Sequence, residues 1–347
     1  TAFDYIFAGE SELTLNKFLT FKERGEQNKF SEVSGLSFRD NGNWVHNERH
    51  PAVTISPGLS SILPPNRNAR IWTGFHFYDV PFDTAESSRG CDFACEFCSI
   101  RNMQTDQTEG TTTIARAKFK QYPLERVVAD LKEAYKQGTR AIFFPDDNPA
   151  MHPADFRNLL TAIIENDLTD IRYSGMVSTA GMSDPNTTRL MKKAGWDFAF
   201  LGVENTYTGN LKAMGTKKTN VDLAARAIDN LHKDGIVVLA GIIAGGPDDT
   251  EEAIRANFEW FYNRPVDAVM CQFLTPYPGT PLRAQLLKEG LVENPGGMDK
   301  KYGGWTTYNG EFAHCRTRAG LMPEQIEAIV YDEQRKFNSK TLGRVLT

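Results

Sequence analysis

The chain has 347 residues, 40% hydrophobic and 24% charged, which is enough for one large domain with attachments or for two domains. Its 39 basic and 44 acidic residues are spread along the sequence, which excludes the basic stripe of a nucleic-acid-binding protein. Residues 236–246 form the longest apolar run, which is too short for a transmembrane segment, and no signal segment opens the sequence. We therefore expect a cytoplasmic protein without nucleic acid as a partner.

The first eighty residues are irregular. Residues 3–10 predict a strand and residues 13–19 a short helix, and the polar residues 40–43 are typical of a hairpin turn. A strand this early lacks obvious partners, so we expect the sequence to be the tail of a longer one. Residues 51–68 are rich in Pro, Ser and Asn, which predicts a linker over the surface.

From residue 83 the pattern is regular, because strand-like segments alternate with segments of helical spacing. The expected strands are residues 84–90, 141–144, 171–178, 198–204, 236–244 and 268–274. The expected helices are residues 123–137, 153–165, 185–194, 220–233, 251–262 and 281–288. Such alternation predicts parallel strands with right-handed crossovers, and six units rather than eight indicate an open, partial α/β barrel. The reactive site is then expected at the carboxyl ends of the strands.

Residues 291–347 break this rhythm and predict an α-helical extension that can cap the substrate site. A final helix is expected from residue 323 to about residue 337, with Pro in its first turn. Trp305 and Tyr308 would suit a flat or apolar substrate, although aromatic residues more often pack in cores.

The five cysteines do not form a disulfide framework, because their number is odd and three of them are clustered. Cys91, Cys95 and Cys98 follow a predicted strand, so three thiolates can converge on one metal centre. Structural zinc and ferredoxin clusters normally take four protein ligands, and the sequence offers no fourth Cys or His nearby. Three cysteines leave one iron of a [4Fe–4S] cluster open, as catalysis requires. A zinc or redox loop is the alternative.

The C-x3-C-x2-C spacing, with Phe97 before the last cysteine, resembles the radical S-adenosylmethionine (SAM) superfamily. Residues 89–100 are similar to the branch that often carries a cobalamin-binding domain, which includes the anaerobic Mg-protoporphyrin cyclase, hopanoid-modifying enzymes and many methylases. The resemblance implies a [4Fe–4S] cluster whose open iron binds the amino and carboxylate groups of SAM. Reductive cleavage then gives methionine and a 5′-deoxyadenosyl radical, which abstracts hydrogen from the substrate.

The resemblance covers roughly residues 4–337 and also divides the chain. Residues 1–82 are expected to be a strand–helix–hairpin remnant of a Rossmann-like domain plus a linker. Residues 83–290 are expected to form a partial (β/α)6 radical SAM barrel, and residues 291–347 its C-terminal extension. The family also implies an external electron donor such as flavodoxin or ferredoxin.

Polar residues fall at further strand ends. Asp146 and Asp147 lie where the family has a polar motif that faces the methionine amino group, and a carboxylate there would hold an ammonium. A helix N-cap is the alternative role for one of them. Ser178 and Glu204 end the next two strands, where the family implies contacts to the methionine carboxylate or ribose hydroxyls. A Glu that closes an apolar strand is costly to bury without a partner.

The last two strands end in glycine and proline. Gly245 matches the family's glycine-containing adenine site, because glycine lets a flat base approach the backbone. Gln272 and Tyr277 precede or lie in a Pro-rich turn like one in the family, so both are expected beside the cofactor, as is Phe97. Tyr277 is equally a packing aromatic.

Three further residues are candidate catalytic groups. Cys271 and Cys315 can give a hydrogen atom to a substrate radical or ligate a second cluster, and buried free cysteines are the alternative. His314, beside Cys315, can act as acid–base or as a substrate ligand.

The predicted function is therefore that of a radical SAM enzyme, of oxidoreductase or transferase type. We expect hydroxylation, cyclisation or rearrangement of a small molecule, lipid or tetrapyrrole. Cobalamin stays open as a cofactor, although the residues present do not support it. If a cobalamin domain precedes Thr1, C-methylation becomes the leading alternative. A non-catalytic iron–sulfur electron carrier predicts no nucleoside site, and a tRNA methylthiotransferase needs three more upstream cysteines.

Overall fold

The structure is a computed structural model of the whole chain. It describes residues 3–9, 11–48, 59, 62–77, 79–100, 119–216, 220–293 and 308–345, the last five by their backbone alone. Trp305 and residues 51–58 of the expected linker lie outside the described residues.

A seven-stranded sheet forms the centre of the molecule. Its strands, from one edge to the other, are β12 (Ala268–Phe273), β11 (Val237–Ala244), β10 (Trp196–Glu204), β9 (Arg172–Ser178), β8 (Ala141–Phe144), β5 (Val80–Thr84) and β4 (His76–Phe77). Only β4 is antiparallel to its neighbour. The other six strands are parallel and follow the order of the chain, so each crossover leads to the adjacent strand.

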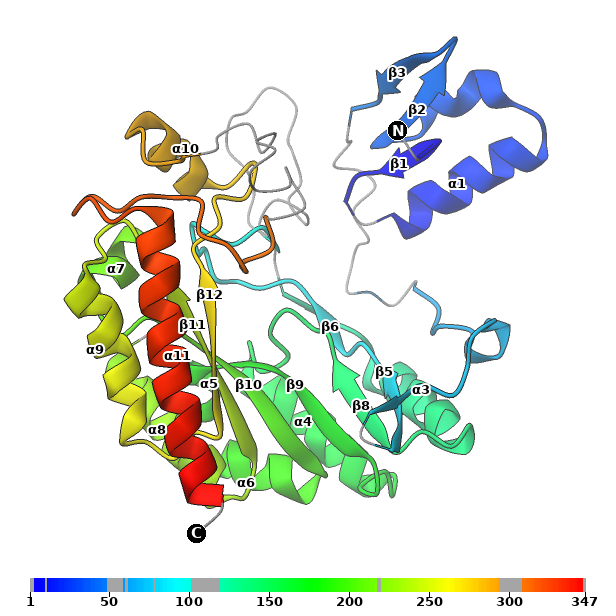
Figure 1. Cartoon of the computed structure of the whole chain (residues 1–347). Helices are drawn as coiled ribbons and strands as arrows, with labels where there is room; N and C mark the ends of the chain where they lie inside the picture. Colours follow the sequence, from blue (N-terminus) through cyan, green and yellow to red (C-terminus); the bar gives the residue numbers. More distant parts are fainter. Residues whose placement is uncertain are drawn as a thin grey trace.

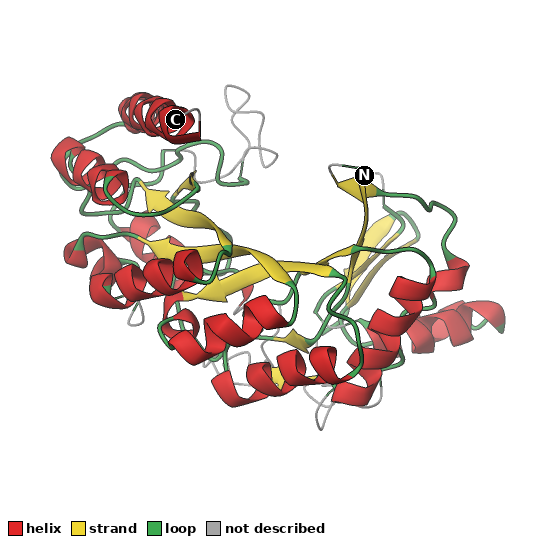
Figure 2. Ribbon diagram, turned by 90° about the horizontal axis from the view of Figure 1, so that it is seen from below, coloured by secondary structure: helices red, strands yellow, loops and turns green. Residues whose placement is uncertain are grey.

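Helices connect successive strands and cover the convex side of the curled sheet, while no described helix covers its concave side (Figure 2). They are α3 (Leu124–Lys136), α4 (Pro153–Glu165), α5 (Thr179–Met182), α6 (Pro185–Lys193), α7 (Thr208–Ala213), α8 (Val221–Lys233) and α9 (Glu251–Tyr262). Helix α10 (Pro281–Lys288) follows the last strand, β12. The predicted α/β partial barrel is confirmed. The short helices α5 and α7 were not expected from the sequence.

Successive side chains along each strand point to opposite faces of the sheet. One set packs in the core under the helices, and the other lies on the concave face. In β10, Trp196, Ala199 and Leu201 are fully buried against the helices, whereas Phe200 is half-buried on the concave side. The Trp196 ring stacks on that of Phe144, with centroids 5.6 Å apart. Burial of large apolar side chains by both layers stabilises the sheet, at about 1.5–3 kcal/mol for each fully buried one.

The expected strand over residues 84–90 is wrong in its position. The sheet strand is β5, which ends at Thr84, and the chain then leaves the sheet. A separate two-residue strand, β6 (Ser88–Arg89), pairs with β7 (Lys120–Gln121) before the cysteines. The cause is local, because the side chains of Ser87 and Ser88 bond to the end of β8 instead of packing in the sheet.

The N-terminal residues form a unit with its own small core (Figure 1). Its strands β1 (Tyr5–Phe7), β2 (Leu36–Asp40) and β3 (Asn43–His46) are antiparallel, and α1 (Glu12–Glu23) and the 3-10 helix η1 (Gln27–Glu32) accompany them. The predicted hairpin is confirmed, with Asn41 and Gly42 both at positive φ. An ion pair of 2.5 Å between Glu12 and Arg89 joins the unit to the barrel.

The C-terminal helix α11 (Pro323–Val345) begins at the predicted proline and runs beyond residue 337. It packs beside α9 and β12 (Figure 1). Within the described residues, no helix is both long enough and apolar enough to cross a bilayer.

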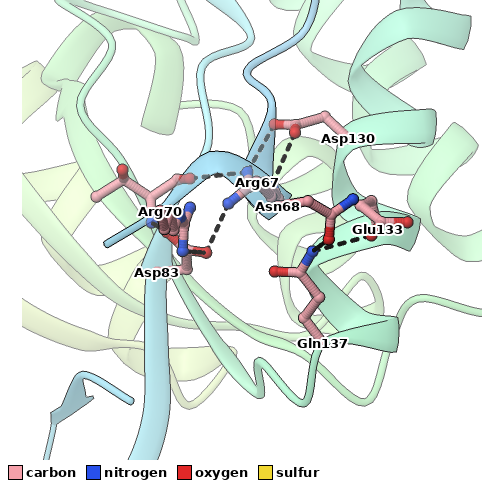
Figure 3. Close-up of polar contacts among 8 residues, drawn as sticks. Arg67, Asn68, Arg70, Asp83, Asp130, Glu133 and Gln137 are labelled. Atoms are coloured by element: carbon pink, nitrogen blue, oxygen red, sulfur yellow. Dashed lines mark hydrogen bonds and ion pairs between the residues drawn. The ribbon is translucent and has the colours of Figure 1, made fainter. Parts of the chain in front are cut away.

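The linker was expected to lie on the surface, but its later part is anchored in the core by Arg67 (Figure 3). This residue lies on a short 3-10 helix, η3 (Arg67–Ala69), and is 3% exposed. Its guanidinium donates two bonds of 2.7 Å to Asp130 of α3 and one of 2.5 Å to Asp83 of β5. Arg70 holds Asp83 from the other side at 2.6 Å. A buried charge needs such partners. We call this group, Arg67 and Arg70 with Asp83 and Asp130, the clasp, and it explains why this part of the linker is not on the surface.

The clasp predicts that two arginine substitutions lower the free energy of unfolding by very different amounts. Arg67→Met leaves Asp130 buried without its counter-charge and should lower the free energy of unfolding by about 3–5 kcal/mol. Arg172→Met removes an exposed pair with Asp197, at 2.5 Å, and should cost at most about 1 kcal/mol. Urea unfolding followed by circular dichroism measures both. Equal losses would contradict the anchoring role.

Candidate active site

The three clustered cysteines lie on a loop that leaves β6 at Gly90, whose φ is +85°. All three are half-buried. The loop is held from behind by its own backbone, because Glu96 donates to the Met214 carbonyl and accepts from the Leu282 amide, both at 3.2 Å. A side chain at Gly215 would collide with Glu96, so this glycine lets the loop approach α7 closely.

A cavity opens beside this loop at the carboxyl ends of β8, β9 and β10. Its polar lining includes Cys91, Cys95, Asp147, Asn148, Ser178 and Glu204. Met176 and Phe200 supply much of the apolar lining. Five of the residues singled out from the sequence are therefore brought together around one space.

The environment of the thiols is acidic. Burial raises the pKa of the Cys98 thiol, and the nearby Cys91, Glu204 and Asp147 raise it further. A cationic centre bound by the thiolates would relieve this repulsion. In the described part of the chain, no three His, Cys, Asp or Glu side chains converge as ligands of a single ion do. An iron–sulfur cluster binds each cysteine through its own iron, so its thiolates need not converge, and the donor set fits such a cluster.

The three polar residues that follow Pro145 at the end of β8 have different roles. Asp146 is buried and accepts bonds of 2.5 and 2.6 Å from the hydroxyls of Ser87 and Ser88. Asp147 lines the cavity and accepts from the Gly90 amide at 2.8 Å. Asn148 also lines the cavity, is 4% exposed, and its Oδ1 has no hydrogen-bond partner. A buried acceptor without a partner is unusual and fits the ammonium group of a ligand.

The N-cap alternative for the two aspartates is wrong. Helix α4 begins at Pro153 with His152 as its N-cap residue, well after both aspartates. Sequence reasoning missed Asn148 as a lining residue. Its only signal was its place next to the two aspartates at the end of a strand.

Glu204 ends β10 in a left-handed conformation, with φ +66°. The register of β10 against β11 shifts between Gly202 and Glu204, which turns the carboxylate toward the cavity. A Cβ at Gly202 would lie 2.9 Å from Glu204 Oε1, so a larger residue there would displace the carboxylate from this position. Non-glycine residues in this region are rare and often lie at functional sites.

Ser178 ends β9 on the cavity wall and also caps α5, where its hydroxyl accepts from the Gly181 amide at 3.4 Å. The oxygen of Ser178 therefore accepts a bond that caps α5, while its hydroxyl proton can still be donated to an acceptor in the cavity.

In the glycine-containing turn after β11, a backbone amide bonds to a side chain of the protein. Gly245 has φ +79°, and the amide of Gly246 donates to Asp249 at 2.9 Å. Asn210 of α7 also donates to Asp249. Gly245 is not among the described residues that line the cavity, and sequence reasoning missed the buried Asp249 that shapes its turn.

The remaining expected cofactor contacts also lie off the cavity lining. Phe97 packs behind the cysteine loop against an apolar cluster that includes Met214 and Leu282. Gln272 is exposed on β12 beside Gly310, and the carbonyl of Tyr277 accepts from the Thr280 hydroxyl at 2.7 Å in a turn. Their roles as cofactor contacts stay predictions.

The candidate catalytic residues lie in packed surroundings. Cys271 is half-buried against the main core, and burial strongly raises the pKa of its thiol. Cys315 is buried, which raises its thiol pKa to about 12. His314 is 1% exposed, with its ring 4.1 Å from that of Tyr308. None of the three lines the described cavity, and their catalytic roles stay predictions.

A family model described as the radical SAM superfamily matches residues 86–261, just over half of the chain and the whole of the site described above. The chain belongs to the radical SAM superfamily. Its members use a [4Fe–4S] cluster and SAM, which agrees with the donor set and the polar cavity of this radical SAM domain. The resemblance predicted from the cysteine spacing is confirmed.

Curated relatives include methyltransferases and cyclases. An uncharacterised methyltransferase of Pyrococcus horikoshii is 26% identical over 83% of this chain and 59% of the relative. The bacteriochlorophyllide d C-12(1)-methyltransferase of Chlorobaculum tepidum is 23% identical over 56% of this chain and 40% of the relative. The anaerobic magnesium-protoporphyrin IX monomethyl ester cyclase of Cereibacter sphaeroides is 23% identical over 98% of this chain and 52% of the relative. The chain spans about half the length of these proteins.

Solved radical SAM structures share the fold. The methyltransferase TsrM from Kitasatospora setae, with cobalamin and a [4Fe–4S] cluster bound, superposes with a TM-score of 0.68 over 94% of this chain and 62% of that chain, at 17% identity. The cobalamin-dependent radical enzyme OxsB superposes with a TM-score of 0.64 over 90% of this chain and 48% of that chain, at 18% identity. At these identities the similarity establishes the fold alone.

The buried Asp249 predicts a pH dependence of stability. Burial, opposed by hydrogen bonds from Gly246, Gly245 and Asn210, raises its pKa from 3.8 to about 6. Between these values the folded protein keeps a proton that the unfolded chain has lost. The free energy of unfolding of the wild type, measured relative to Asp249→Asn, should therefore fall as pH rises through this window, by up to ~3 kcal/mol, and be level above it. Urea unfolding of both proteins across the range checks this, and a difference that rises with pH would contradict it.

Proposed function

We propose that this chain cleaves SAM reductively at a [4Fe–4S] cluster bound by Cys91, Cys95 and Cys98, and directs the resulting radical at a C–H bond of an organic substrate. The observation that carries the proposal is the cavity itself. Two of the three cysteines share it with polar side chains from three consecutive strand ends. An electron carrier without catalysis has no use for such a ligand site.

The bound cluster and SAM supply the electron transfer and the 5′-deoxyadenosyl radical, and the protein binds, orients and shields. Asp147 and Asn148 offer oxygens to an ammonium group, which is a charge-assisted interaction for the carboxylate. Ser178 can donate to a carboxylate, and Glu204 can accept from ribose hydroxyls. Met176 and Phe200 exclude water from the side of the cavity that faces the open sheet.

The substrate class follows from the concave face of the sheet. Met176 and Met270 are 36% and 41% exposed there, on β9 and β12, and Phe200 lies on β10 between them. Flexible thioethers and aromatic rings suit an apolar ligand of irregular shape. We therefore propose an apolar substrate, such as a lipid or a tetrapyrrole, for hydroxylation, cyclisation or rearrangement. The electron donor is proposed to be a small external protein such as flavodoxin or ferredoxin.

C-methylation is the second candidate, and the names of the relatives favour it. Four of them are named as methyltransferases of bacteriochlorophyllides or methylases of hopanoids at carbon atoms, and TsrM is a methyltransferase with cobalamin bound. Among the described residues we identify no set of side chains that fits cobalamin, so no residue of this chain is assigned to it.

Radical formation has a direct test. Anaerobically reconstituted protein with dithionite should convert SAM to 5′-deoxyadenosine, measured by liquid chromatography. Cys95→Ala should reduce the product to the level seen without protein, because the cluster loses one of three ligands. Cys271→Ala removes a thiol outside the cavity and tests the alternative that this thiol ligates a second cluster, since unchanged iron content would exclude that role. A wild-type protein that holds a full cluster yet makes no 5′-deoxyadenosine would overturn the proposal.

A second measurement separates the two candidate reactions. With methyl-labelled SAM and added hydroxocobalamin under the same reducing conditions, a methyltransferase should release S-adenosylhomocysteine together with 5′-deoxyadenosine, because methylation of the reduced cobalamin and radical formation each consume one SAM. An enzyme of hydroxylation, cyclisation or rearrangement should release 5′-deoxyadenosine or regenerate SAM, without S-adenosylhomocysteine. The label in the product of an extract supplied as substrate identifies the acceptor.

A further inference from the structure

Two consecutive carboxylates at the end of β8 hold the backbone that leads into the cysteine loop. Asp146 accepts from the backbone amide of Ser87 at 3.1 Å, in addition to the hydroxyls of Ser87 and Ser88. Asp147 accepts from the Gly90 amide, immediately before Cys91. The chain is thus fixed at three of the four residues that precede the first cysteine.

The Asp146 contacts are buried. Asp146 is 2% exposed, Ser87 2% and Ser88 1%. A buried carboxylate is costly unless its oxygens are bonded, and here hydroxyl and amide donors from one short segment supply those bonds. Asp146 is not among the described residues that line the cavity, whereas Asp147 is.

The segment that Asp146 holds has a few other contacts. The Tyr122 amide donates to the Ser87 carbonyl at 3.0 Å, and Arg89 pairs with Glu12 at 2.5 Å. Strand β6 has two residues and pairs only with the two-residue β7 in the described part of the chain. A two-stranded ribbon of this length is marginal by itself. On its other side, Arg89 reaches Glu86 at 2.8 Å, which also accepts from Tyr122 at 2.7 Å. These contacts are half-exposed, so the buried bonds of Asp146 are the stronger restraint.

We propose that Asp146 is a positioning residue for the metal centre: by binding Ser87 and Ser88 it sets the place of Cys91 and so the readiness of the three thiols to hold a cluster. This inference rests on the proposed function for the identity of the cluster. The neighbouring Asp147 faces the cavity. Asp146 therefore holds the backbone before the cysteines, while Asp147 is the one placed to contact a ligand.

Two variants test the proposal from opposite sides. Asp146→Asn keeps the shape but puts an NH2 group where an oxygen accepts from two hydroxyls. The double variant Ser87→Ala, Ser88→Ala removes the same donors. Each should lose iron to a chelator about tenfold faster than the wild type, the size expected for one to two lost buried hydrogen bonds. Combining all three changes should add nothing, because the same contacts are removed.

Glu333→Gln is the control, since Glu333 of α11 is also a buried carboxylate that accepts from several donors, here the side chains of Arg255 and Lys336. It should leave the rate of iron loss and the electron paramagnetic resonance signal of the reduced cluster unchanged, whereas Asp146→Asn should broaden or shift that signal. A general loss of stability would affect both variants. Wild-type rates of iron loss in Asp146→Asn and in the double serine variant would overturn the proposal.

A readout in cluster-free protein keeps this proposal distinct from the proposed function. Alkylation followed by peptide mapping gives the labelling rate of Cys91 relative to that of Cys315. That ratio should rise about tenfold in Asp146→Asn and in the serine variant, because Cys91 becomes more mobile. A wild type that binds no cluster would overturn the proposed function, while an unchanged ratio would overturn the positioning role whatever the wild type binds.

Discussion

The barrel and its candidate active site depend on the burial of one face of the parallel sheet under helices. Trp196, Phe144 and Tyr173 form an aromatic layer between sheet and helices, with no solvent exposure. Because side chains alternate along a strand, this burial also decides which residues face the other way. Side chains on the concave face do not have to pack against helices. The carboxyl ends of the strands can therefore carry polar groups, which would be costly to bury in a core.

Buried carboxylates recur in the structure, and in each case groups of the protein donate hydrogen bonds to them. Asp130 pairs with the charge of Arg67, Asp146 accepts from two hydroxyls and an amide, and Asp249 accepts from an amide and from Asn210. Full pairing lets these groups fix loops at strand ends without a metal or ligand. The cavity differs from them, since its polar atoms face one another across an open space and favour a ligand that carries both donors and acceptors.

The regular elements were predictable because they depend on local periodicity. The strand over residues 141–144 and the helix over residues 153–165 were placed correctly from their apolar spacing. The burial of Arg67 was not, because its partner Asp130 lies far along the chain and no local pattern announces the pair. Asp146 and Asp147 were equally hard to separate, since successive side chains at a strand end point in opposite directions and the sequence does not say which points inward.

The buried clasp at Arg67 also bears on where the barrel can be cut from the rest of the chain. A fragment that began at residue 83 would keep Asp83 and Asp130 but lose the guanidinium that lies between them. Two carboxylates would then remain close together in a nonpolar setting, with Arg70 absent as well. We therefore expect the smallest stable piece to start upstream of Arg67, which makes the described residues 62–77 part of the barrel rather than a tether to it.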